Sequence, residues 1–215
     1  MSNYVELCHL GDNCAPGIII NDILHIRQKC LFMLGLYNFN DILFYLNDND
    51  FENIYNREHL VNESNVWIYH NVYKFIFNHD YHLENGEITN YDFIKDRFDI
   101  KIKNFREMLS SDNTCVFISF TENINYIEIG GMLYWLTLNK KKFHLMIFTN
   151  NTYNSTFSPE HLSIIKLDTS YEKWYEKDSG YKYILYKEIY EKFIHHLHIH
   201  NISNDFPKTF ESINF

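Results

Sequence analysis

The sequence predicts an α/β protein: a single domain in which helices flank a layered, mixed or mostly parallel sheet. Two observations lead to this fold class. Short apolar runs of strand length alternate with longer segments of helical periodicity, most regularly from residue 91 onward. The chain has 215 residues, of which 46% are hydrophobic, enough for one large core. We expect this domain over residues 1–200 and a C-terminal tail over residues 201–215.

The expected strands are short, mostly apolar runs, and the run at 72–77 alternates around Lys74. They lie near residues 4–10, 72–77, 115–120, 143–148 and 162–167, with a shorter β-like run at 66–70. Apolar side chains at helical spacing predict helices near residues 15–29, 39–46, 91–109, 122–138 and 181–197. Polar composition predicts loops at residues 47–63, 82–90 and 150–160, and a solvated turn at 140–142.

Cys14 is the most informative residue of the chain. The strand expected at residues 4–10 stops at Gly11 and a polar pair, and a helix is expected directly after Cys14. Pro16 fits the first turn of that helix. Free backbone N–H groups and the positive end of the helix dipole meet there and lower the pKa of a thiol. The position predicts a nucleophilic cysteine, whereas the structural alternative is a small residue that fills a tight turn.

The other three cysteines have apolar neighbours and fit the core. They are Cys8, Cys30 and Cys115, and no pair has C-x-x-C spacing. The N-terminus lacks a basic region followed by an apolar core, the pattern of a secretory signal. We therefore expect reduced thiols and a cytoplasmic protein.

The composition of the chain limits the classes of binding partner that we expect. The net charge of -9 and the mixing of acidic and basic residues do not favour nucleic-acid binding. No apolar run reaches the length of a membrane span, so we expect no membrane partner. Ala15 is the only alanine, while Asn, Ile, Lys, Tyr and Phe abound, which indicates an AT-rich genome such as that of a large DNA virus. In that case the compartment is the cytoplasm of the host cell.

A nucleophilic cysteine needs a base and a group that orients the base. Among twelve histidines, His79 directly follows an expected strand and precedes Asp80, so we expect His79 as the base and Asp80 as the orienting acid. His70 and His25 are rival bases, and Asp168 is the rival acid. Sites of α/β sheets collect beyond the carboxyl ends of strands, which is where Cys14, His79 and Asp168 are expected.

An oxyanion hole also has candidates in the turn. The backbone N–H of Cys14 and a group from Asp12 or Asn13 are placed to bind a developing negative charge, with Gly11 completing the site loop. The structural alternative for Asn13 is a turn residue in a left-handed conformation.

Metal and cofactor signals are weak. His196 and His200 have the i,i+4 spacing that can chelate zinc on a helix, but no Glu stands in an H-E-x-x-H arrangement. We expect surface histidines there and no metal site. The chain has no phosphate-binding glycine loop, so no cofactor is expected either.

Several ordered motifs resemble the DUF1796 family of papain-like cysteine peptidases. The family begins with a strand and an L-G-x-N-C motif before a helix, which residues 10–14 match, and continues with an H-D pair after a strand, which His79 and Asp80 match. Similar segments between and after these motifs are Asn49–Ile54, Arg97–Phe105 and Val116–Ile118. The resemblance covers roughly residues 4–150.

The resemblance implies acyl transfer through a thioester, with a peptide, isopeptide or other amide as substrate. Three departures from the family pattern matter. Residues 32–35 lack the P-F-D-W motif, Ile100 and Asn104 stand where arginine is common, and Ser119 ends a strand that often ends in arginine. The alternative is therefore a catalytically degenerate module that binds a host or viral protein. A strict papain fold also has a largely antiparallel sheet, unlike the layered sheet expected here.

Overall fold

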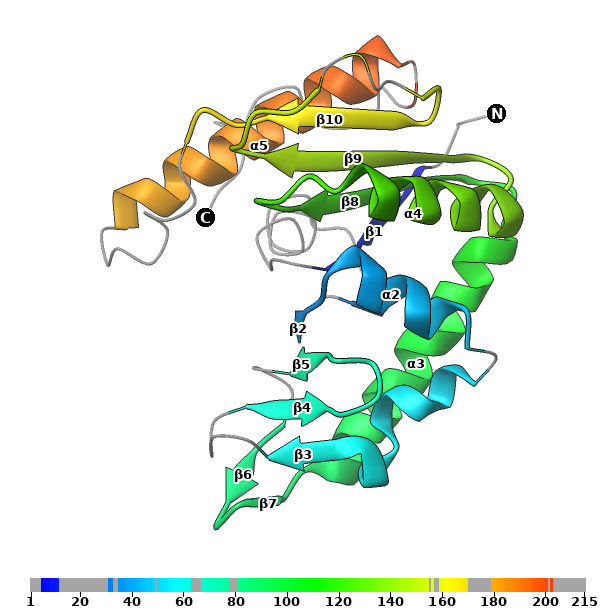
Figure 1. The fold of residues 1–215 in the computed structure, drawn as a ribbon, viewed down its shortest axis with the longest axis vertical. Helices are drawn as coiled ribbons and strands as arrows, with labels where there is room; N and C mark the ends of the chain where they lie inside the picture. The colour runs from blue at the N-terminus through cyan, green and yellow to red at the C-terminus, as the bar shows by residue number, and fades with distance from the viewer. Residues whose placement is uncertain are drawn as a thin grey trace.

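The computed structural model describes most of the chain between residues 5 and 202. The described ranges are 5–11, 31–32, 35–48, 50–62, 67–77, 81–154, 156, 159–169, 179–200 and 202. Within them, a layered sheet and its helices lie at one end of the molecule, and a smaller sheet lies at the other (Figure 1). None of the described helices combines the length and apolar character that crossing a membrane requires.

The layered part is built on a four-stranded parallel sheet. Its strands are β1 (Val5–His9), β8 (Thr114–Phe120), β9 (Phe143–Thr149) and β10 (Leu162–Lys166), in the order β1-β8-β9-β10. All three pairs are parallel, which confirms the α/β fold class. The strands are apolar along most of their length because helices cover both faces.

The parallel sheet separates the apolar core into two clusters, and helices cover the sheet on both faces. The last helix, α5 (Ser179–Ile199), covers one face through side chains such as Leu185, Ile189 and Phe193. On the other face, α4 (Tyr126–Asn139) and α3 (Tyr91–Ser110) pack against strand residues such as Phe117 and Leu145. The expected helices at 91–109, 122–138 and 181–197 are confirmed, although α4 begins only after Asn125 caps it. The helix expected at 15–29 lies outside the described residues.

The smaller sheet corrects one expectation. Its strands are β2 (Gly35–Leu36), β5 (Ile76–Phe77), β4 (Ile68–His70) and β3 (Leu60–Asn62), which pair antiparallel in the order β2-β5-β4-β3. The strand expected at 72–77 is therefore short and belongs to this sheet. Residues 71–73 form a turn and Lys74 has a positive φ of 62°, so the chain reverses where extended backbone was expected.

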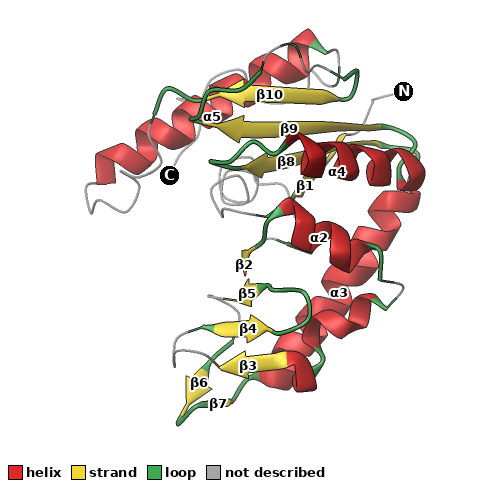
Figure 2. Ribbon diagram, in the orientation of Figure 1, coloured by secondary structure: helices red, strands yellow, loops and turns green. Residues whose placement is uncertain are grey.

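The elements around the smaller sheet are short (Figure 2). Helix α2 (Phe39–Leu46) was expected, and Asn38 caps it by accepting from the Asp41 amide at 2.8 Å. Two 3₁₀ turns follow, η2 (Phe51–Tyr55) and η3 (Arg57–His59). The loop expected at 82–90 contains a hairpin of β6 (Leu83–Glu84) and β7 (Glu87–Ile88), because Asn85 and Gly86 both adopt the positive φ of a tight hairpin turn.

Lys140 also departs from the expected solvated turn. Its side chain is buried, with 2% exposed. The ammonium donates to the carbonyl oxygens of Met108 at 2.6 Å and Ser111 at 2.7 Å, and to the Ser111 hydroxyl at 2.9 Å. These acceptors lie at the carboxyl end of α3, where helix carbonyls have no partner within the helix. Lys140 therefore caps α3, which sequence spacing does not reveal.

Candidate functional site

The carboxyl end of β1 lies on Tyr37. Gly11 has a positive φ of 42°, and a Cβ atom built there would lie 2.4 Å from the Tyr37 carbonyl oxygen and 2.7 Å from Ile42 Cδ1. No other residue fits this conformation and this space without a shift of the backbone. Tyr37 and Ile42 occupy the positions of a hydrophobic staple around the α2 cap, so the start of α2 forms a fixed surface under the turn.

The end of β5 lies on the same tyrosine. The Tyr37 ring packs edge-on against Phe75 at a centroid distance of 4.5 Å and against Phe77 at 6.2 Å. The β2–β5 ladder fixes this contact, because Gly35 pairs with Phe77 two residues before Tyr37. The segment that leads to the expected nucleophile and the segment that leads to the expected base therefore both contact Tyr37.

Of the expected site residues, the structure describes only Gly11. Asp12, Asn13, Cys14, His79 and Asp80 lie outside the described residues. Their contacts thus stay predictions, and the geometry available is that of the strand ends on either side.

The rival base His70 is a structural residue. It is fully buried, its Nδ1 accepts from the amides of Val72 at 3.3 Å and Tyr73 at 3.2 Å, and its Nε2 donates to the Asn53 carbonyl at 2.8 Å. Burial lowers its pKa to about 4, so the ring stays neutral near pH 7 and holds the turn before β5. The other rival, His25, lies outside the described residues.

The rival acid Asp168 lies at the other edge of the sheet. It follows β10, which is three strands from β1, a separation of about 14 Å at the usual strand spacing. The expected grouping of Asp168 with the end of β1 is therefore wrong, because the strand order places two strands between them.

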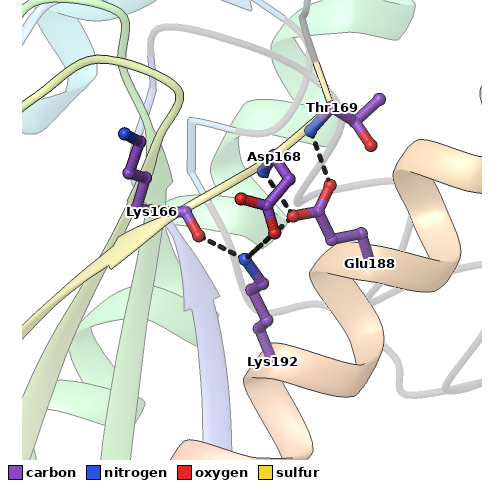
Figure 3. A network of polar contacts seen from close by, with 5 residues as sticks. All are labelled: Lys166, Asp168, Thr169, Glu188 and Lys192. Atoms are coloured by element: carbon purple, nitrogen blue, oxygen red, sulfur yellow. Dashed lines mark hydrogen bonds and ion pairs between the residues drawn. The ribbon is translucent and has the colours of Figure 1, made fainter.

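Asp168 instead belongs to a network that fixes the end of β10 to α5 (Figure 3). The Glu188 carboxylate accepts from the amides of Asp168 at 2.5 Å and Thr169 at 2.9 Å. The Lys192 ammonium donates to the Lys166 carbonyl at 2.5 Å and lies 3.1 Å from the Asp168 carboxylate and 2.9 Å from Glu188. Each charged group of the network is thus engaged in holding the chain, which is a structural role.

The described cysteines fill the core, as expected. Cys8 and Cys115 are buried with no exposed surface, and the Cys115 sulfur lies 3.3 Å from the Met108 sulfur. Cys30 lies outside the described residues. A thiol in such apolar surroundings is inert, because burial raises the cost of its charged form.

An open groove lies along α3 and η2, away from the ends of the parallel strands. It has a volume of about 440 Å³ and is lined by charges of both signs, among them Glu52, Lys95 and Arg106. Asp99 accepts from the Tyr55 hydroxyl at 2.6 Å and from Lys95 at 2.9 Å. Burial, and then the hydrogen bond to Asp99, raise the pKa of Tyr55, so the phenol stays a hydrogen-bond donor. The balanced charges give this groove no clear ligand preference.

Metal ligands do not gather in the part of the chain that the structure describes. No group of three or more His, Cys, Asp or Glu side chains there has an arrangement that could hold a metal ion. The expected surface histidines His196 and His200 differ from each other: His200 is exposed, whereas His196 is partly buried.

The chain matches no protein-family model, no curated protein and no solved structure. The resemblance to papain-like peptidases thus stays a prediction from the motifs.

One residue of this region was missed by the sequence analysis. Tyr37 joins the two strand ends, and the signal that could have found it is local. An aromatic residue directly before a capping Asn, with an apolar residue at the fourth helical position, is the pattern of a hydrophobic staple. That pattern predicts a fixed helix entry but not what packs on it.

Proposed function

We propose that this protein is a thiol hydrolase of the papain-like kind, which cleaves a peptide, isopeptide or other amide. In this proposal Cys14 is the nucleophile, His79 is the base and Asp80 orients the imidazole. The substrate is a protein or peptide, and neither a metal nor a cofactor takes part.

The observation that carries the proposal is the shared contact of two strand ends with Tyr37. Ladder spacing and chain geometry along this contact keep the Gly11 and Phe77 Cα atoms within about 18 Å. Cys14 is at most about 10 Å of extended chain from Gly11, and His79 at most about 7 Å from Phe77. The two segments are therefore long enough for the thiol and the imidazole to meet.

Two eliminations support the same pair. Cys8 and Cys115 are buried core thiols, and no substrate carbonyl can reach them. His70 is neutral, buried and fully used by its backbone contacts. These exclusions narrow the choice of nucleophile and base without fixing it.

The proposed reaction is acyl transfer in two steps. His79 takes the proton of the Cys14 thiol, and the thiolate attacks the carbonyl carbon of the amide. The carbon–nitrogen bond breaks as His79 gives its proton to the leaving amine, and a thioester remains. Water, deprotonated by His79, then releases the acid and restores the thiol. The Cys14 amide and a group from Asp12 or Asn13 would bind the oxyanion in both steps.

A binding module is the second candidate, and the outer face of α4 favours it. Ile127, Tyr134 and Leu138 lie on one face of this helix and are 87%, 69% and 66% exposed. Exposed apolar side chains gathered on one helix face are typical of protein-binding surfaces. In this alternative the catalytic groups are degenerate and the protein engages a host or viral protein.

The test is the rate at which iodoacetamide labels each cysteine, read by mass spectrometry between about pH 5 and pH 9, where ordinary thiols ionise near pH 8.5. Cys14 should label fastest and stay reactive well below pH 8.5, because a nearby imidazolium stabilises its thiolate. His79→Ala should slow Cys14 labelling near pH 6 by about tenfold or more. His82→Ala, which removes an exposed histidine three residues further along the chain, is the matched control and should leave the rate unchanged.

Labelling that requires both Cys14 and His79 would reject the degenerate-module alternative. If Cys14 instead reacts as an ordinary thiol in the wild type and in His79→Ala, the enzyme proposal is wrong. If labelling does require both residues, cleavage of fluorogenic peptide amides by the wild type, absent in Cys14→Ala, would define the substrate class.

A further inference from the structure

A cluster of histidines lies where the end of α5 meets the parallel sheet. His144 of β9 is buried, and its Nε2 lies 2.9 Å from the Ser163 hydroxyl of β10. The same hydroxyl lies 3.2 Å from Nε2 of His200, directly after α5. The His200 ring is 4.7 Å from the His144 ring and stacks at 6.0 Å on that of His196. One serine thus joins two strands to the end of the helix.

The single hydroxyl proton of Ser163 limits how the two rings beside it can be protonated. A hydroxyl has one proton, so Ser163 donates to one imidazole and accepts from the other. If both rings carried Nε2 protons, the hydroxyl would accept twice and its own proton would need another acceptor. Ser163 is 6% exposed, so water cannot readily supply one. Nδ1 of His196 is also buried and has no hydrogen-bond partner among the residues that the structure describes.

The charged groups that face the cluster make protonation still less favourable. From the segment before β10 comes His161, and from α5 come His195 and Lys192, whose field acts on His196. The Lys192 ammonium is positively charged. No carboxylate is among the described groups that act on His144 or His196. Among the described residues, a positive charge on His144 or His196 therefore meets burial and repulsion.

We propose that this cluster is an acid-sensitive latch: protonation of the buried His144 releases the last turn of α5 from β9 and β10. Above neutral pH the Ser163 bridge holds His200, and Leu197 packs into the apolar cluster on that face of the sheet. In acid the His144 ring gains a proton, the bridge fails and the end of the helix opens. This inference is independent of the proposed thiol chemistry.

The size of the effect follows from the buried histidine. Burial, and then the neighbouring His200, lower the pKa of His144 to about 4, against an ordinary value of 6.5. We take the pKa of His144 as about 4 in the closed form and as the ordinary 6.5 in the open form. With these pKa values the ratio of open to closed protein rises by about 30-fold when the pH falls from 7.5 to 5. The latch is fully closed above the ordinary value and weakens as the pH falls toward 4.

Hydrogen exchange measured by mass spectrometry tests the latch. Exchange rates are compared near pH 7.5 and near pH 5, after correction for the intrinsic effect of pH on each amide. In the wild type, protection of the peptide over residues 193–202 should fall by about 30-fold in acid. The peptide over residues 126–139 in α4 should keep its protection and serves as the internal reference.

Variants assign the effect to the cluster. His144→Asn keeps a side-chain N–H toward Ser163 but cannot titrate, so the acid-induced loss should fall below about threefold. His82→Asn, a change at an exposed histidine, should behave as the wild type. If His144→Asn does not fold, His144→Gln replaces it, because a glutamine also has a side-chain N–H and cannot titrate.

Three results would overturn the proposal. One is equal protection of residues 193–202 at both pH values, and another is an acid-induced loss that persists in the variants. The third is a parallel loss of protection in α4, which would indicate global acid unfolding.

Discussion

Replacement of Gly11 by alanine tests the packing that brings the two strand ends together. Gly11 is the last described residue before the expected nucleophile, and its φ of 42° lies in the left-handed region. The Cβ of alanine would lie 2.4 Å from the Tyr37 carbonyl oxygen, a backbone atom that cannot rotate away. The substitution therefore forces either β1 or the start of α2 to move.

The expected loss of stability is the sum of a few opposing contributions. An alanine in the left-handed region costs about 1–2 kcal/mol. Inserting a methyl group into a packed contact costs about 1–3 kcal/mol more. The smaller conformational entropy of the unfolded alanine chain returns about 0.4–1 kcal/mol. The net expectation for Gly11→Ala is a loss of about 1–5 kcal/mol in the free energy of unfolding.

Gly130→Ala is the matched control within the same protein. A Cβ at Gly130 meets nothing within 4 Å, and the residue lies inside α4. Here alanine should stabilise by about 0.5–1 kcal/mol, because glycine is a poor helix former. The two identical substitutions thus have opposite expected signs.

Urea denaturation followed by circular dichroism measures both variants. Gly11→Ala should lower the midpoint with an unchanged slope, and Gly130→Ala should raise it. A Gly11→Ala protein as stable as the wild type would mean that the turn after β1 does not rest on Tyr37. In that case the segments bearing Cys14 and His79 would not share a contact with Tyr37.

Two further substitutions test the polar contacts of the fold. Lys140→Met should lower the free energy of unfolding by about 2–4 kcal/mol in the same urea assay, since it removes the buried ammonium that donates to the Met108 and Ser111 carbonyls. The exposed Lys141→Met should change it by less than about 0.5 kcal/mol. Burial alone would raise the pKa of Glu188, but the hydrogen bonds from Thr169, Asp168 and Lys192 outweigh it and lower the pKa below 4.5. The stabilisation from Glu188 is therefore complete above pH 4.5 and is lost as the pH falls through the lowered pKa. Glu188→Gln should flatten the acid limb of a plot of melting temperature against pH. Glu191→Gln, at an exposed position, should leave that limb unchanged.

The sequence by itself determined the elements with strong local signals. The apolar runs at 115–120, 143–148 and 162–167 are strands β8, β9 and β10, and the amphipathic segment at 91–109 is α3. Periodicity succeeds in these segments because burial on one or both faces imposes a repeat of apolar residues along the chain. The burial of Cys8 and Cys115 followed from their apolar neighbours in the same way.

Only the tertiary structure decided which chain segments meet. The sequence offered Asp168 as a rival acid near the end of β1. Strand order separates β10 from β1, and Glu188 and Lys192 contact the segment after β10. The sequence predicted a solvated turn at Lys140, whereas the structure buries its ammonium against the carbonyl of Met108 in α3. A local pattern records whether a residue is buried but not its partner, because contacts between distant segments depend on how elements pack. For the same reason, the meeting of β1 and β5 on Tyr37 had no signature in the chain.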